Sequence, residues 1–231
     1  MNLKKLISLL MAASVLLVGA VLPARAGILS QWTFEASLPT TAGPISPEVG
    51  SGIGSARHAD LATDYSHPAG SGSDASWSAN RWTTGDYFQF RLDTLGYQNV
   101  VVSWDQTSRL QGPSSFEFSY SLDGDNFNFF DNNDVSDSWA SYSVDLSSVS
   151  MLNNASAVYF RVSAAAMVNF GGRDPNDTFP PDGTSQIDNF TVSATAVSTA
   201  VPDSLPGPVS VATLLVLVAL SRCFSTRRCL S

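Results

Sequence analysis

The stretch between the two apolar ends of the chain, residues 27–200, contains no cysteine and no lysine. The two cysteines of the 231-residue chain, Cys223 and Cys229, lie beyond it, so this stretch can form neither a disulfide nor a thiolate zinc site. It holds six arginines and 19 of the 20 acidic residues, a formal balance of −13. A domain this acidic is a poor partner for phosphate backbones, which argues against nucleic-acid binding.

The sequence also lacks the usual patterns of nucleophilic and metal-dependent catalysis. It contains no Gly-x-Ser-x-Gly elbow. Its two histidines, His58 and His67, lie in a segment without periodicity, where exposed loop positions are expected. The acidic turn 123–126 lacks the glutamate of an EF-hand and is typical of a hairpin. We therefore expect no enzyme. A glycan-acting hydrolase stays open as the less favoured alternative, because its carboxylate pair is defined by distance in space.

The N-terminus has the three parts of a secretory signal. Lys4 and Lys5 form a basic start, residues 6–22 are apolar, and residues 24–26 offer the small-basic-small pattern Ala-Arg-Ala. This order predicts a signal peptide over residues 1–26 and export of the chain. An uncleaved membrane anchor is the alternative.

The C-terminus predicts a membrane anchor behind a linker. Residues 194–208 are rich in alanine, serine, threonine and proline, as expected of a tether. Residues 209–221 form a short apolar run, which with the residues just before it reaches the lower limit for a spanning helix. The arginines in residues 222–231 fit a cytoplasmic tail under the positive-inside rule.

This tail resembles the PEP-CTERM sorting signal of Gram-negative bacteria, in which a Val-Pro-acidic motif precedes a membrane helix and an arginine cluster. The matching residues are Val201, Pro202, Asp203, Arg222, Arg227 and Arg228. The resemblance implies an exosortase-like processing enzyme, transit through the inner membrane, and delivery to the cell surface or an extracellular matrix rich in exopolysaccharide. An ordinary C-terminal anchor with a chance motif is the alternative.

Residues 27–193 predict a single all-β domain. Apolar and polar residues alternate, which places successive side chains on opposite faces of a strand. The segments that alternate most clearly are 86–93, 99–106, 115–121, 142–146, 158–163 and 187–192. A one-residue slip at Asp188 and Asn189 predicts a bulge, and Asp123-Gly124 predicts a hairpin. Residues 38–81 and 167–185 show no pattern, and only residues 146–155 suit a helical turn. We therefore predict an antiparallel β-sandwich.

Three segments give this region a resemblance to the galactose-binding-like jelly roll of many carbohydrate-binding modules. They are Trp32-Thr33-Phe34-Glu35, the strands within residues 86–104, and residues 185–192. The resemblance implies a structural Ca²⁺ where the first and last strands meet, with Glu35 and Asp188 as ligands. Carboxylates that are solvated, or that accept turn amides, are the alternative.

Sugar binding needs aromatic faces at the surface with polar side chains beside them. The candidates are Tyr65, Trp77, Trp82, Tyr87 and Tyr159, with Arg81 and Arg109 among the hydrogen-bonding partners. For Trp77 and Trp82 the alternative is a structural role, in which their rings close the ends of the sandwich. Trp32, Trp104 and Trp139 are assigned to the core. We expect a surface-sorted, non-catalytic polysaccharide-binding or matrix protein. A purely structural matrix protein without a ligand site is the alternative.

Overall fold

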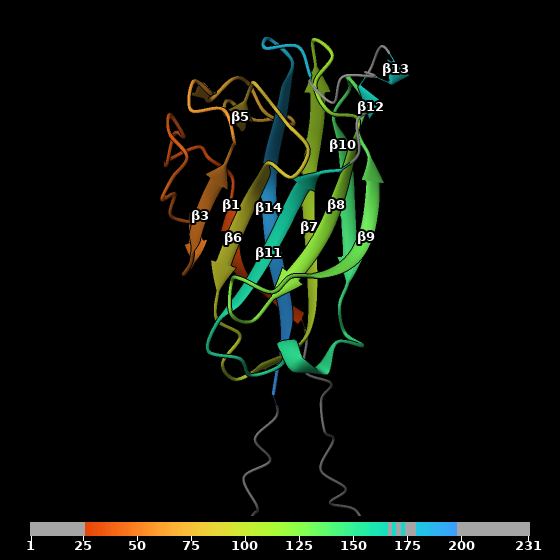
Figure 1. Ribbon diagram of the computed structural model, residues 1–231. Coiled ribbons are helices and arrows are strands. Elements are labelled where there is room, and N and C mark those ends of the chain that lie inside the picture. Colours follow the sequence, from red (N-terminus) through yellow and green to blue (C-terminus); the bar gives the residue numbers. More distant parts are fainter. Residues whose placement is uncertain (1–25, 166–167, 170–171, 174–178, 198–231) are drawn as a thin grey trace, which may run out of the picture. The chain divides into compact units, whose positions relative to one another are not determined.

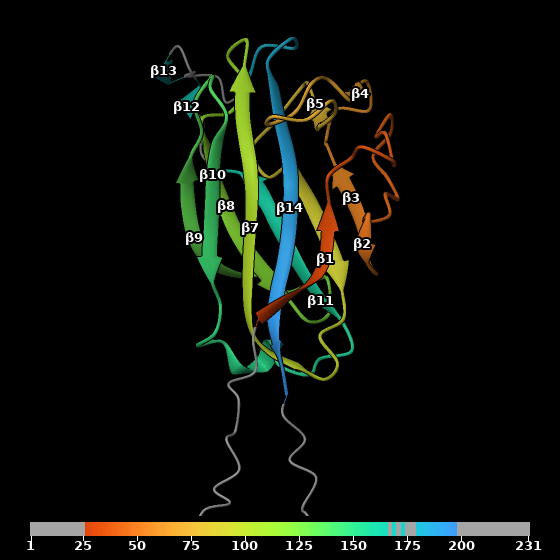
Figure 2. The same ribbon diagram turned by 180° about the vertical axis from the view of Figure 1, so that it is seen from behind.

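A computed structural model describes residues 26–165, 168–169, 172–173 and 179–197. These residues form two antiparallel sheets that face each other, one in front in Figure 1 and the other in front in Figure 2. The predicted antiparallel β-sandwich is therefore confirmed. No helix in the described part is long and apolar enough to cross a membrane. The predicted span 209–221 and residues 1–25 of the predicted signal peptide lie outside the described residues.

The first sheet, called sheet A, is built around its longest strands. In spatial order it contains β10 (Ala140–Asp145), β7 (Tyr97–Arg109), β14 (Thr184–Ala196), β1 (Ala26–Trp32) and β2 (Val49–Gly50), with β5 (Trp77–Ala79) beside β14 and β4 (Tyr65–Ser66) beside β5. β14 pairs with β7, β1 and β5, so it joins both ends of the chain's folded part into one sheet.

The second sheet, called sheet B, contains five strands. In spatial order they are β3 (Ile53–Arg57), β6 (Tyr87–Leu92), β11 (Val158–Ala164), β8 (Ser115–Ser121) and β9 (Asn128–Asp134). A separate ribbon pairs β12 (Val168–Asn169) with β13 (Gly172–Arg173). The helical turn expected within residues 146–155 is the 3-10 turn η1 (Ser150–Leu152).

The core consists of the inward-facing residues of both sheets. Along β6 and β11 every second side chain is buried, as the alternation predicts. Phe90 of sheet B stacks on Phe190 of sheet A, with ring centroids 3.6 Å apart and planes 11° apart. Trp104 of sheet A stacks on Phe118 of sheet B at 5.3 Å. Ring packing thus joins the two sheets along their length.

The predicted bulge lies in the middle of β14. Its register against β7 shifts between Asp188 and Thr191, and Asn189 has a φ of 51°, a left-handed conformation that asparagine tolerates. The extra residue lets Ile187 and Phe190, three positions apart, both reach the core.

Three expectations differ from the structure. The sequence predicts a linker from residue 194, but β14 continues to Ala196, because Ala194 is buried and Thr195 pairs with both neighbouring strands. Residues 38–81 hold four short strands, each too brief to show a period. The sequence predicts Trp139 in the core, but this residue is only partly buried, because it lies just before edge strand β10.

The stacked pair Phe90 and Phe190 gives a stability prediction. Phe90→Ala removes a fully buried ring between the sheets and should lower the free energy of unfolding by about 3–5 kcal/mol. Urea unfolding of the full-length chain in non-ionic detergent, followed by tryptophan fluorescence, measures the loss. Leu61→Ala removes a fully exposed side chain and should change the value by less than about 0.5 kcal/mol. Equal losses in both variants would contradict this account of the core.

Candidate functional site

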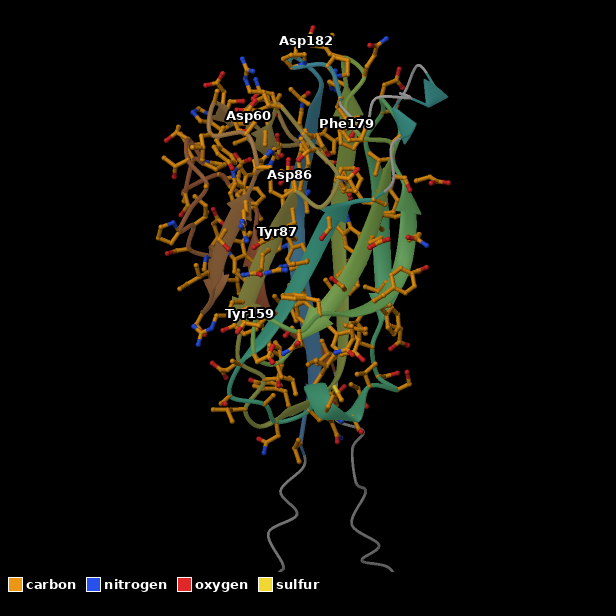
Figure 3. All side chains as sticks on the ribbon, viewed as in Figure 1. Asp60, Asp86, Tyr87, Tyr159, Phe179 and Asp182 are labelled. Atoms are coloured by element: carbon orange, nitrogen blue, oxygen red, sulfur yellow. The ribbon has the colours of Figure 1, made fainter. Side chains whose placement is uncertain are left out.

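The outer face of sheet B carries an ordered set of polar and aromatic side chains. Because alternate residues point outward, cross-strand partners on β3, β6, β11 and β8 form rows across this face. The three rows are Arg57, Tyr87, Ser163 and Glu117; then Ser55, Gln89, Arg161 and Ser119; then Ile53, Arg91, Tyr159 and Ser121. Figure 3 shows Tyr87 and Tyr159 on this face.

Arg161 is the centre of these rows. Its guanidinium carbon lies 3.9 Å from the ring centroid of Tyr87 and 3.5 Å from that of Phe127, so two aromatic faces enclose it. Its Nε donates to Gln89 Oε1 at 2.7 Å and its Nη2 donates to the Tyr87 hydroxyl at 3.1 Å. Burial lowers the pKa of Arg161, and the nearby charge of Arg57 lowers it further.

The loop between β8 and β9 covers part of this face, and Figure 1 shows it passing in front of β11. The Asp123 carboxylate accepts from the backbone amides of Asp125 and Asn126 and from the Asn126 side chain, which holds the turn and lowers the pKa of Asp123. Gly124, at a φ of 82°, lies against the Tyr159 ring. The Asp-Gly hairpin predicted from the sequence is therefore present, and its loop forms one wall of a groove.

That groove has a volume of about 510 Å³. It is lined by residues of β8, β9 and β11 together with three adjoining segments: Thr84, Gly85, Glu117, Ser119, Phe127, Phe129, Arg161, Ser163, Ala164 and Ala165. Phe129 presents an aromatic ring that is 58% exposed. Hydroxyl, carboxylate and guanidinium groups next to such rings are suited to a ligand with both apolar faces and many hydroxyls.

The other aromatic candidates lie elsewhere. Trp77 and Trp82 have exposed fractions of 0% and 1%, so their rings belong to the core, the alternative that the sequence left open. Tyr65 is half-buried and packs near Trp77 and His58. Of the five predicted aromatic residues, Tyr87 and Tyr159 are the two on the outer face of sheet B, and they lie beside the groove and not in its lining.

The two predicted arginines also lie outside the groove. Arg81 faces Asp60, with Nη1 and Oδ2 3.4 Å apart. Arg109 is exposed at the end of β7, opposite Thr184. Sequence reasoning missed Arg161, Phe127 and Phe129. Arg161 did show a signal, since it alternates outward between Phe160 and Val162 on the same strand as Tyr159.

His58 is buried, against the expectation of an exposed loop histidine. Its ring packs edge-on against Trp82 with centroids 4.3 Å apart. Within the described part neither ring nitrogen has a well-formed hydrogen bond, and Nδ1 lies 3.5 Å from Asp86 Oδ2. Asp86 is satisfied instead by the amides of Ala59 and Thr83. Burial lowers the pKa of His58, opposed by the charge of Asp86 and by nearby backbone groups.

The predicted calcium ligands both reach the loop before β5. Asp188 is buried and accepts from the Ser71 amide and the Ser73 hydroxyl, while Glu35 accepts from the Ala75 amide at 2.9 Å. A Cβ added to Gly70 would collide with Asp188 Oδ2, the Ala75 carbonyl and the Ser73 hydroxyl, so these oxygens converge on one point. Burial raises the pKa of Asp188. Oxygen donors of this kind fit Ca²⁺, although no cluster of three or more acidic, histidine or cysteine side chains occurs among the described residues.

The sequence matches no protein-family model and no curated protein. Several solved structures are similar in fold. A family 61 carbohydrate-binding module in complex with β-1,4-galactotriose is 10% identical, with a TM-score of 0.42, and the match covers 69% of this chain and 92% of that one. The CBM22-1 and GH10 modules of Clostridium thermocellum xylanase 10B with xylohexaose are 15% identical, with a TM-score of 0.46, over 74% and 29% of the two chains. The K1 adhesin domain of Lys-gingipain from Porphyromonas gingivalis W83 is 15% identical, with a TM-score of 0.39, over 75% and 99%.

The buried, uncharged His58 predicts a loss of stability in mild acid. The unfolded chain takes up this proton below about pH 6.5, whereas the folded chain resists it because its pKa is lowered. The contribution is therefore complete above pH 6.5 and is lost as the pH falls toward the folded pKa, by about 1.4 kcal/mol per pH unit. Thermal melting between pH 7.5 and 5 measures it.

Two variants separate His58 from the other histidine. His58→Gln should flatten the decline in melting temperature, even if it lowers the value at pH 7.5. His67→Gln, at an exposed position, should keep the decline of the parent chain. A decline that survives His58→Gln unchanged would show that another group titrates.

Proposed function

We propose that this protein is a non-catalytic polysaccharide-binding module and that its ligand lies in the groove on the outer face of sheet B. The observation that carries the proposal is the aromatic enclosure of Arg161 by Tyr87 and Phe127, beside the exposed ring of Phe129. A ring held rigidly at the surface offers contact area at a low cost in side-chain entropy. The apolar face of a sugar ring suits such a surface.

Polar groups in the groove supply the other half of sugar recognition. Ser163 and Arg161 project from β11, opposite Glu117 and Ser119 of β8. These groups include both donors and acceptors, which a sugar hydroxyl can engage together. The combination favours a carbohydrate over a purely apolar ligand.

The lining of the groove also supports a non-catalytic role. Among the described residues that line it, Glu117 is the one carboxylate. Glycoside hydrolysis generally requires two carboxyl groups about 5–10 Å apart across the scissile bond. We therefore favour binding over hydrolysis, and we retain the galactose-binding-like jelly roll as part of the proposal.

Export and surface sorting complete the proposal. Residues 1–26 support secretion, and the tail with Val201, Pro202 and Asp203 supports processing by an exosortase-like enzyme after transit through the inner membrane. A module placed in this way would meet polysaccharide of the cell's own matrix. The competing proposal, a structural matrix protein, predicts that no glycan is retained.

We also propose a structural calcium ion held by Glu35 and Asp188 with oxygens of the Gly70–Ala75 loop. The support is the convergence of oxygens at Gly70 and the burial of Asp188 beside strand β5. When bound, the ion would neutralise a carboxylate that burial otherwise disfavours in its charged form. It would tie the loop to the end of β1 and to the bulge of β14.

The calcium proposal predicts stability that depends on the ion. At a free concentration 100 times the dissociation constant, binding contributes about 2.7 kcal/mol. Chelation with EGTA should therefore lower the melting temperature of the full-length chain by about 5–10 °C, and added CaCl₂ should restore it. Asp188→Asn should abolish the response to both additions. A parent chain that melts at the same temperature with EGTA and with CaCl₂ would rule the ion out.

The binding proposal predicts a specific effect of Phe129. Phe129→Ala removes the exposed ring of the groove without touching the core and should weaken glycan binding about tenfold. Affinity electrophoresis of the full-length chain against a panel of soluble neutral and charged polysaccharides measures this. Tyr97→Ala removes a partly exposed ring on sheet A and should bind like the parent chain. If no polysaccharide retards the parent chain, the structural alternative is favoured.

A further inference from the structure

We propose, building on the proposed function, that the outer face of sheet B selects an anionic polysaccharide, whose acidic groups bind Arg161 in the groove and Arg57, which lies outside the groove on the far side of Tyr87. The inference starts from where the few arginines lie. The structure describes the side chains of five arginines, and three of them, Arg57, Arg91 and Arg161, project from the outer face of sheet B. In a domain that is acidic and lacks lysine, most of the described arginine side chains therefore lie on one face.

These three guanidiniums have no carboxylate partner in the described part of the chain. The arginine ion pair found there joins Arg81 to Asp60, and Asp60 lines a separate pocket with Arg57 without pairing with it. Arg161 and Arg91 are held by tyrosine hydroxyls and an amide oxygen, which orient them without neutralising them. Their positive charge therefore stays available to a ligand.

Arg57 and Arg161 are also close enough to disfavour each other. Arg57 pairs with Tyr87 across β3 and β6, and the Tyr87 ring lies against the Arg161 guanidinium. The charge of Arg57 lowers the pKa of Arg161, in the same direction as burial. An anion bound by both guanidiniums would relieve both effects, because an opposite charge favours the charged form of each.

The donor geometry suits an acidic group. A guanidinium carries five N–H donors in a planar fork that matches a carboxylate or sulfate. Within the described part Arg161 uses its Nε and Nη2, which leaves the Nη1 donors, and Arg57 has no hydrogen bond there. Because Tyr87 and Phe127 fix the Arg161 plane on both sides, little side-chain entropy is lost when a ligand binds.

The overall acidity of the domain sets a limit on this attraction. At physiological ionic strength charges act over about 8 Å, so the acidic residues of the far faces are screened from the groove. Glu117 lines the groove, the charge of Asp125 in the covering loop acts on Arg161, and Asp60 lines a separate pocket with Arg57. We therefore expect recognition by contact at Arg57 and Arg161, with little long-range steering.

The test compares matched polysaccharides that differ only in charge. Affinity electrophoresis of the full-length chain in non-ionic detergent, at constant calcium, would use polygalacturonate against its fully methyl-esterified form, and dextran sulfate against dextran. We expect the charged member of at least one pair to bind about ten- to a hundredfold more tightly than its neutral partner. The pair that responds distinguishes carboxylate from sulfate.

Matched arginine variants test whether the arginines on this face are responsible. Arg57→Gln should lose about tenfold in affinity for the charged polymer and keep its affinity for the neutral one. Arg109→Gln removes an exposed arginine outside the face and should bind like the parent chain. Equal losses in Arg57→Gln and Arg109→Gln would assign the binding to general surface charge and overturn the inference.

The outcomes separate this inference from the proposed function. If neutral polysaccharides bind as well as charged ones, or only neutral ones bind, the domain remains a polysaccharide-binding module and the preference for acidic groups is overturned. If none of the panel binds, both fall together. Retention of a charged polymer that Arg57→Gln weakens and Arg109→Gln does not would support both.

Discussion

The packing of aromatic rings between the two sheets is the constraint on which the other features depend. Phe90 on Phe190 and Trp104 on Phe118 fix which residues of each strand face inward. Since side chains alternate, the same contacts fix the outward residues, and the rows around Arg161 are set by the register of the core. A slip of one residue in β11 would bury Arg161 and expose Phe160, so the core enforces the presence of the candidate site.

The bulge in β14 lets one strand serve two purposes. Without it, strict alternation would place Ile187 and Phe190 on opposite faces, and one of the two would leave the core. The two residues at the bulge, Asp188 and Asn189, make other contacts. Asp188 holds the loop before β5 through Ser71 and Ser73, and Asn189 donates to Asp105 on β7. The irregularity therefore connects the sheet to the loop where the calcium ion is proposed.

Much of the fold follows from the sequence, because long alternating strands have a face that can be recognised from their residues. The bulge and the outward positions of Tyr87 and Tyr159 derive from that alternation, and the hairpin follows from the Asp123-Gly124 turn between two such strands. Trp77 could not be placed in this way, since β5 has three residues and all of them are buried. The enclosure of Arg161 by two aromatic rings also could not be predicted from the sequence. It depends on a loop folding back over the sheet so that Phe127 meets a residue 34 positions later, and no local pattern encodes that distance.

The net charge of the domain and the local charge in the groove determine different interactions. The formal net charge of −13 for residues 27–200 determines how the whole domain interacts with a long polyanion such as nucleic acid. Binding in a groove depends instead on the charges within a few ångströms of the ligand. The chemistry of the arginine side chain also matters at this position. A planar, weakly hydrated guanidinium can lie between the Tyr87 and Phe127 rings and still donate from its edge, while the compact ammonium of lysine would stay hydrated and could not fill that space. A body without lysine can in this way keep a fixed positive centre on a single face.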